Sequence, residues 1–122
     1  MGTTERRHYR RRRDNFRVDM RPFRAGSGFI PKVLRDGAVF VGHSRDLSVS
    51  GMALVVKDAL PLGFLLSADI HVPELDQPIS LVVEVVRCQV IPSKGYDLGL
   101  RNVPQWIGES ERAALIGLLY DS

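Results

Sequence analysis

The segment Ile79–Ile91 reads Ile-Ser-Leu-Val-Val-Glu-Val-Val-Arg-Cys-Gln-Val-Ile, with regularly spaced apolar residues that change parity midway. An odd-numbered apolar face is formed by Ile79, Leu81, Val83 and Val85, and an even-numbered one then follows with Val86, Cys88 and Val90. Because successive side chains of a strand point to opposite faces, the change predicts a β-bulge or sharp bend near this pair. A long strand that bends in this way is typical of a small β-barrel. After the bend, even-numbered residues are expected to face the core, and Arg87 and Gln89 to point away from it.

Short apolar segments separated by turn residues predict the other strands. Leu66–Val72 alternates most regularly, with apolar residues at even positions and polar residues at odd positions between them. Turns are predicted at Asp36-Gly37, where the pair tolerates the positive φ of a tight hairpin, and at Ser93–Gly95. The predicted strands are Val18–Met20, Ile30–Leu34, Ala38–His43, Met52–Val56, Leu66–Val72, Ile79–Ile91 and Tyr96–Val103.

Residues 109–120 are predicted to form an amphipathic helix. Ala114, Leu115, Leu118 and Leu119 recur at spacings of three and four, so they share one face. Ser110 is expected to cap the first turn, and the helix is expected to lie across one end of the barrel. The sequence thus predicts a mainly β fold, a small antiparallel barrel of six to seven strands with a C-terminal α-helix.

Length and composition indicate a single globular domain. The chain has 122 residues, of which 44% are apolar and 25% charged. It contains no apolar run of the ~20 residues that a membrane-spanning helix needs, and no apolar secretion signal near the N-terminus. The single cysteine, Cys88, cannot form an internal disulfide, so we expect a cytoplasmic protein.

Positive charge is concentrated at the N-terminus. Residues 1–24 contain nine arginines against three acidic residues, a net charge of +6, whereas residues 25–122 have a net charge of −3. We expect residues 1–17 to form a flexible Arg-rich arm and residues 18–122 to form the barrel domain. Arginine binds phosphate or a guanine edge through two parallel hydrogen bonds, so the arm indicates an anionic partner. The alternative is a solvated tail that only aids solubility.

The sequence contains none of the common catalytic motifs. His8, His43 and His71 lack the spacing of a zinc site, and Cys88 falls on a predicted apolar face. A nucleophile elbow, a phosphate-binding glycine loop and a dinucleotide fingerprint are all missing from the sequence. We therefore expect a binding protein without a cofactor rather than an enzyme.

Two segments combine the residue types of a ligand site. Residues 11–20 form an Arg-rich stretch that leads directly into the first predicted strand. Residues 46–51, Asp-Leu-Ser-Val-Ser-Gly, form a polar turn predicted between two strands. Each segment alone has an ordinary explanation. The Arg-rich stretch can be a solvated arm, and residues 46–51 can be a common turn in which Asp and Ser side chains bind backbone amides.

Together the two segments resemble the PilZ domain family, bacterial receptors for cyclic di-GMP. The family carries Arg-x-x-x-Arg before its first strand, which Arg13–Arg17 matches, with Arg12 preceding as is frequent in the family. It carries Asp/Asn-x-Ser-x-x-Gly at a later turn, which Asp46, Ser48 and Gly51 match.

The resemblance extends from residue 12 to about residue 120 and implies a PilZ-like split barrel. Residues 96–101, Tyr-Asp-Leu-Gly-Leu-Arg, are similar to the closing strand of the family. The Arg motif is best placed at Arg13–Arg17 because Val18 begins the strand at once. Other registers of the Arg motif are Arg6–Arg10, Arg7–Arg11 and Arg17–Arg21.

The resemblance also implies the ligand and the residues that bind it. Arginine forks would bind a guanine edge and the phosphates, and a carboxylate would accept hydrogen bonds from the other guanine. Binding would order the arm over the barrel and alter a surface for a downstream protein partner. The implied ligand residues are Arg12, Arg13, Arg17, Asp46, Ser48 and Gly51, with Arg11 and Arg87 as additional candidates.

Two other functions remain open. A small nucleic-acid-binding barrel could use the arm on phosphates, but the acidic body and the scattered aromatic residues disfavour nucleic acid. A PilZ-like fold could also serve only as a protein-interaction adaptor, which the complete set of motif residues disfavours.

Overall fold

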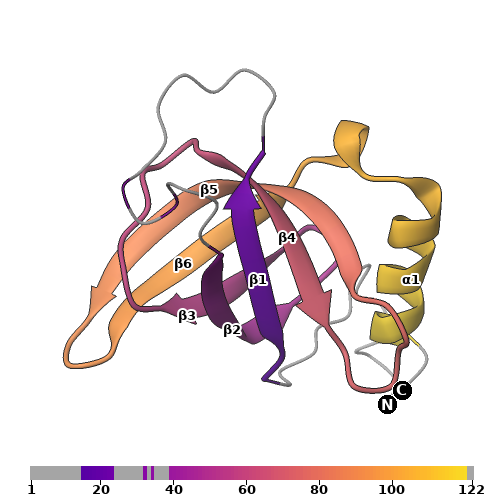
Figure 1. Ribbon diagram of the computed structural model, residues 1–122, viewed down its shortest axis with the longest axis horizontal. Coiled ribbons are helices and arrows are strands. Elements are labelled where there is room, and N and C mark those ends of the chain that lie inside the picture. The colour runs from indigo at the N-terminus through magenta and orange to yellow at the C-terminus, as the bar shows by residue number, and fades with distance from the viewer. Residues whose placement is uncertain (1–14, 24–31, 33, 35–38, 121–122) are drawn as a thin grey trace, which may run out of the picture.

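Six antiparallel strands form a closed barrel in the computed structural model, which describes residues 15–23, 32, 34 and 39–120. The strand order around the barrel is β1-β2-β3-β6-β5-β4 (Figure 1). The elements are β1 (Arg17–Pro22), β2 (Phe40–Leu47), β3 (Gly51–Val56), β4 (Leu65–His71), β5 (Ile79–Ile91), β6 (Gly95–Asn102), the 3-10 turn η3 (Pro104–Trp106) and α1 (Glu109–Tyr120). The prediction of a mainly β barrel with a C-terminal helix is confirmed.

Alternating apolar side chains fill the barrel. In β1, Val18 and Met20 are fully buried, and in β4 the same is true of Leu66, Ala68 and Ile70. The intervening residues face outward, so each strand covers the core on one side and contacts solvent on the other. Removing this apolar surface from water is the main force that holds the six strands together.

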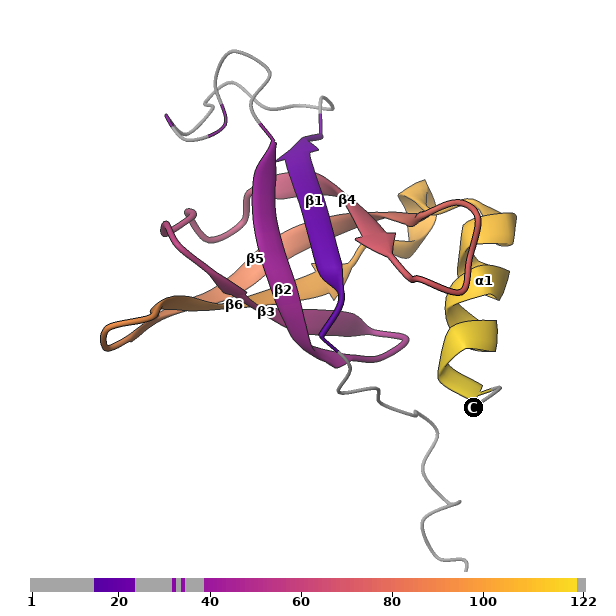
Figure 2. The same ribbon diagram turned by 60° about the horizontal axis from the view of Figure 1, so that its bottom comes forward.

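The bulge predicted in the long strand is confirmed. In β5, Val85 pairs with Leu100 and Arg87 with Gly99, so Val86 has no opposite residue on β6. The prediction that the even-numbered residues after the bulge face the core is wrong for Val86 and Val90, which are 48% and 66% exposed. Here β5 and β6 continue as a hairpin that projects beyond the barrel wall, so no opposite wall covers these side chains (Figures 1 and 2).

The helix α1 has the predicted bounds and the predicted apolar face. Leu115 and Leu119 are buried in the core, while Ala114 and Leu118 pack against it. Figure 1 shows α1 at one end of the barrel. The prediction for Ser110 is wrong, because this residue lies inside the first turn of α1. The carbonyl of Gly108 accepts the hydrogen bond of the Arg112 N–H, so the helix begins before Ser110.

Two strand predictions differ from the structure. The strand predicted at Ala38–His43 extends to Leu47, so Asp46 lies within β2 beside a register shift rather than in a turn. Of the strand predicted at Ile30–Leu34, only Lys32 and Leu34 are described, and both lie in 3-10 turns. The turn predicted at Asp36-Gly37 lies outside the described residues. No helix in the described part of the chain has the length and apolar character needed to cross a membrane.

Candidate ligand-binding site

The turn between β2 and β3 is closed by Ser48. Its backbone N–H donates to the Gly51 carbonyl at 2.9 Å, and its hydroxyl contacts the same carbonyl at 3.3 Å. The hydroxyl also lies 3.2 Å from that of Ser50. Because Ser48 is buried and its hydroxyl is engaged within the turn, it shapes the turn in this structure.

Gly51 allows β3 to approach β6 closely at the end of this turn. It pairs with Arg101, and a Cβ atom added here would lie 2.1 Å from the carbonyl oxygen of Leu100. No side chain fits at that distance from backbone. The Gly of the motif is therefore required by the packing of two strands, independently of any ligand.

Asn102, at the end of β6, holds the same turn from the other side. Its side-chain Nδ2 donates to the Val49 carbonyl at 2.8 Å, and its backbone N–H donates to the Ser50 carbonyl at 2.8 Å. Sequence reasoning missed Asn102, since only the pairing of β3 with β6 brings residues 49 and 102 together.

A pocket of about 500 Å³, here called the Asp46 pocket, opens beside this turn and collects four of the predicted ligand residues. Asp46, Ser48 and Gly51 line one part of it, and Arg87 from β5 lines another. Two further arginines line the pocket, Arg45 and Arg101. Sequence reasoning missed both of these arginines. Arg45 directly precedes Asp46 but belongs to neither motif, and Arg101 approaches the pocket through the pairing of β3 with β6.

The arginines of this pocket are held by carboxylates. Arg45 and Arg87 both bind Asp97, with N–O distances of 3.4 and 3.3 Å, and Arg101 forms an ion pair with Glu84. All three arginine side chains remain about half exposed. They therefore have donors to offer an incoming anion, and their carboxylate partners fix where those donors lie.

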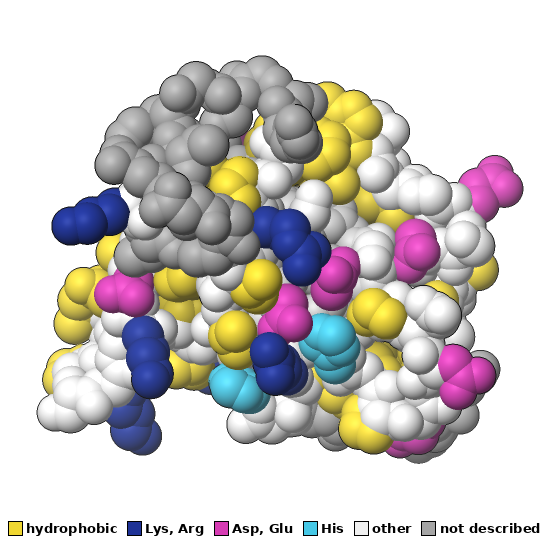
Figure 3. Space-filling model, in the orientation of Figure 1, with side chains coloured by type: hydrophobic (Ala, Val, Ile, Leu, Met, Phe, Trp, Pro, Cys, Tyr) yellow, Lys and Arg dark blue, Asp and Glu magenta, His cyan; other side chains and the backbone are white. Residues whose placement is uncertain are grey.

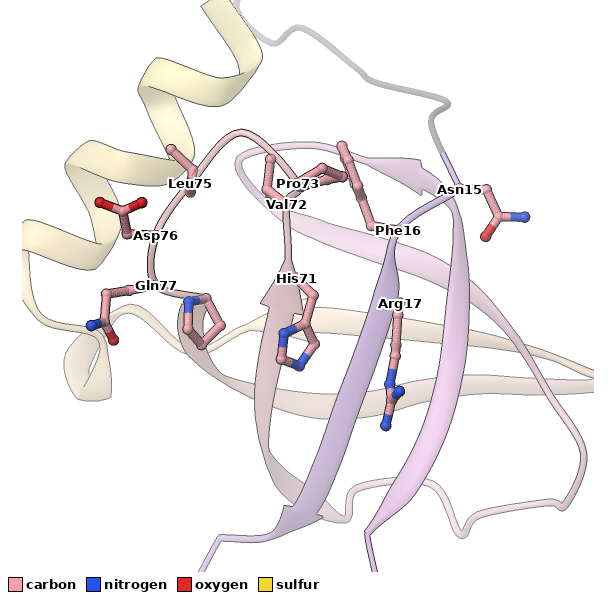
Figure 4. A pocket seen from close by; sticks show the side chains of 10 residues that line it. Asn15, Phe16, Arg17, His71, Val72, Pro73, Leu75, Asp76 and Gln77 are labelled. Atoms are coloured by element: carbon pink, nitrogen blue, oxygen red, sulfur yellow. The ribbon is translucent and has the colours of Figure 1, made fainter.

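Arg17 lies in a different pocket, of about 370 Å³, which Figure 4 shows. Its Nε donates to Asp19 at 2.8 Å, and His71 Nε2 lies 3.1 Å from the other oxygen of that carboxylate. Burial raises the pKa of Asp19, but the hydrogen bonds and charges of Arg17 and His71 outweigh burial and lower it below its usual range. Figure 3 shows basic, acidic and histidine side chains interspersed over β1 and β4.

The first described residues are fixed against β2, the strand that carries Asp46. The Phe16 N–H donates to the Ser44 hydroxyl at 2.9 Å, and the Ser44 N–H donates to the Phe16 carbonyl at 2.8 Å. Ser44 is two residues before Asp46 on β2. The predicted ligand residues Arg11, Arg12 and Arg13 lie outside the described residues, a few positions before this fixed point.

A family model described as the PilZ domain matches residues 5–120 of the chain. A search of curated proteins found no significant match.

Three solved structures have a similar fold. An inhibitor of motility from Bacillus subtilis (MotI/DgrA) has a TM-score of 0.68 at 21% identity, and the alignment covers 94% of this chain but half of that protein. The PilZ domain of YcgR from Escherichia coli, solved with c-di-GMP, has a TM-score of 0.61 at 14% identity, covering 95% and 90% of the two chains. The PilZ domain of CeSA from a cellulose-synthesizing bacterium has a TM-score of 0.58 at 13% identity, covering 91% and 95%.

Proposed function

The chain belongs to the PilZ domain family, and from this premise we propose that it is a receptor for cyclic di-GMP rather than an enzyme. One observation carries the proposal: Asp46, Ser48 and Gly51 line one pocket together with three half-exposed arginines. The likeness to a PilZ domain solved with c-di-GMP supports the same ligand.

The chemistry of this pocket fits a guanine dinucleotide. Guanine N1 and N2 donate hydrogen bonds, which Asp46 would accept in this proposal, and guanine O6 and N7 accept the paired N–H groups of an arginine. The phosphates need further donors, which Arg45, Arg87 and Arg101 have available. Arg87, whose side chain lies across Gly99, also has a flat face on which a base can stack.

The point where the arm joins the described chain supports a role for its arginines. Phe16 is fixed beside Ser44, two residues before Asp46 on β2. An extended chain spans ~3.5 Å per residue, so the short stretch between Phe16 and the two residues Arg12 and Arg13 allows both arginines to reach Asp46. We assign these two arginines to the ligand, with Arg11 as an additional contact. Arg17 joins them when its guanidinium group leaves the Asp19 carboxylate and binds a phosphate oxygen of the ligand.

In this proposal, ligand binding is signalled by a change in the surface that the barrel and the arm present to other proteins. The arm carries like charges, which an anionic ligand neutralises, and neutralisation favours an ordered arm over the barrel. The new surface then binds a downstream protein.

Calorimetric titration with cyclic di-GMP tests the proposal. Saturable binding is expected for the wild-type chain, and Arg13→Ala and Asp46→Ala are each expected to weaken it at least about tenfold while the melting curve stays cooperative. Arg112→Ala and Asp58→Ala are matched controls, because both residues are exposed and lie outside the pocket. Tight binding retained by both site variants would refute the site.

The same titration separates the two other functions. GTP and a short DNA duplex are added as competitors at two salt concentrations. Binding of the duplex that falls steeply with salt, without heat from the dinucleotide, would identify a nucleic-acid-binding protein. If the folded chain binds neither the dinucleotide nor the duplex, the remaining function is that of a protein-interaction adaptor.

A further inference from the structure

The far half of β5 has a strand neighbour on one side only, within the described residues. β4 pairs with β5 from Ile79 to Glu84, and its first residue, Leu65, lies opposite Glu84. The preceding residues Gly63 and Phe64 continue these backbone hydrogen bonds as far as Val85. Beyond the bulge, β5 pairs with β6 up to Ile91. Figures 1 and 2 show this part of β5 beside β6, extending away from β4, and β3 pairs with the other side of β6 as far as Tyr96. Along an edge of this kind, every second residue directs its backbone N–H and C=O outward, ready to pair with another strand.

The side chains at this edge are apolar and exposed. Val86 is 48% exposed and Val90 66%, and Leu62 on the neighbouring segment is 68% exposed. The three residues border one groove of about 540 Å³. Native proteins usually protect a strand edge with charge or proline, but here Arg87 is the only charged side chain between Val86 and Val90.

We propose that residues 86–90 pair antiparallel with the same residues of a second copy of this chain. The sequence of the edge is complementary to itself when the two-fold axis passes by Cys88. Val86 then lies opposite Val90 of the second copy, Arg87 opposite Gln89, and Cys88 opposite Cys88. Two valine pairs form, and no like charges face each other.

Neighbouring registers are less favourable for the same side chains. An axis at Arg87 places two guanidinium groups opposite each other, which destabilises the pair. An axis at Gln89 places Arg87 opposite Ile91 and leaves Val86 without an apolar partner. The charge pattern therefore favours the axis at Cys88.

This pairing would also bring two ligand pockets together. Val86 and Arg87 line the Asp46 pocket as well as the edge. In the dimer these residues of both copies lie close to the axis, so the two pockets become neighbours. The dimer itself does not depend on the proposed ligand, and the first test is made without it.

Sedimentation velocity of the full chain over a wide concentration range tests the pairing. Wild-type protein is expected to form a dimer as concentration rises. Val90→Lys is expected to weaken the dimer at least about tenfold, because symmetry places the lysine twice in the interface, each time opposite a valine. Leu75→Lys is the matched control: Leu75 is 41% exposed, lies in the β4–β5 loop and is expected to leave the dimer unchanged.

A charge-swap experiment tests the register. Val86→Glu and Val90→Lys should each impair self-association, whereas an equimolar mixture of the two variants should recover a dimer. In the mixed dimer the introduced carboxylate of one copy faces the introduced ammonium group of the other across the axis. A chain that is monomeric at all concentrations would overturn the proposal, as would a dimer that Val90→Lys leaves intact. A monomer that instead binds extended peptides at this edge would assign the surface to another protein.

Discussion

The side-chain amide of Asn102 donates a hydrogen bond of 2.8 Å to the carbonyl of Val49, which lies 53 residues earlier in the chain. Asn102 is 6% exposed, and its backbone N–H binds the next carbonyl of the same turn. The last residue of β6 therefore fixes two carbonyls in the turn that carries Ser48. The shape of the Asp46 pocket depends on this contact as well as on the residues that line it.

Asn102→Ala is expected to destabilise the fold and to weaken the binding of the ligand. The Val49 carbonyl loses its side-chain donor, which costs about 1–3 kcal/mol of unfolding free energy. The freed turn then samples other conformations, so affinity for cyclic di-GMP should fall although Asn102 does not line the Asp46 pocket. Chemical denaturation and calorimetry measure the two effects.

The control for Asn102 is Gln105→Ala, which changes an exposed residue outside the Asp46 pocket. It should leave both stability and affinity close to the wild type. An Asn102→Ala variant with full affinity would show that the turn keeps its shape without this bond.

Gly51→Ala is expected to destabilise the barrel even without ligand. The new Cβ would lie 2.1 Å from the Leu100 carbonyl, so β3 and β6 must separate locally. A loss of about 1–3 kcal/mol is expected from such overpacking, measured by denaturant unfolding. Gly108→Ala is the control, because its nearest contact is 4.0 Å away. Equal stability of both variants would contradict the close approach of β3 and β6.

The stability contributed by Asp19 should disappear in acid. Arg17 and His71 lower the pKa of Asp19 below 3.8 in the folded state. A lowered folded pKa means that the stabilisation is present above the unfolded value and is lost as pH falls through the folded value. At pH 7, Asp19→Asn should lower the melting temperature by roughly a few degrees. The difference from wild type should shrink below pH 3.8, and a difference constant from pH 7 to pH 2 would contradict this ion pair.

The sequence predicted features within single strands better than it predicted contacts between distant segments. The parity change at Val85–Val86 lies within one strand, so the sequence alone was sufficient to predict the bulge. Whether Val90 faces the core depends on where β4 begins, and the pairing of its first residue, Leu65, with Glu84 joins distant segments of the chain. The alternation of apolar residues in β5 therefore predicted the bulge correctly but predicted the burial of Val86 and Val90 wrongly.

The candidate site shows the same division. Asp46, Ser48 and Gly51 lie within six residues, so a short motif identified them. Arg45 directly precedes Asp46 but belongs to neither motif, so the motif did not identify it. Arg101 reaches the same pocket from β6, and its contribution follows from the pairing of β3 with β6, which the sequence did not predict.

The ion pair between Arg17 and Asp19 should compete with ligand binding. In the structure, the Arg17 Nε donates to Asp19 at 2.8 Å, outside the Asp46 pocket. If Arg17 moves to a phosphate of cyclic di-GMP, Asp19→Asn removes its competitor and should raise affinity about two- to five-fold. Arg17→Ala should lower affinity about tenfold. Calorimetry at neutral pH measures both changes.

A matched pair of residues provides the control for Arg17. Arg21 binds Asp69 at 3.4 Å further along the same strands, and neither residue lines the Asp46 pocket. Asp69→Asn should therefore leave affinity unchanged, since the arginine that it releases has no place in the proposed site. Unchanged affinity in both Arg17→Ala and Asp19→Asn would remove Arg17 from the ligand site. The phosphates would then depend on the arm and on the three arginines of the pocket.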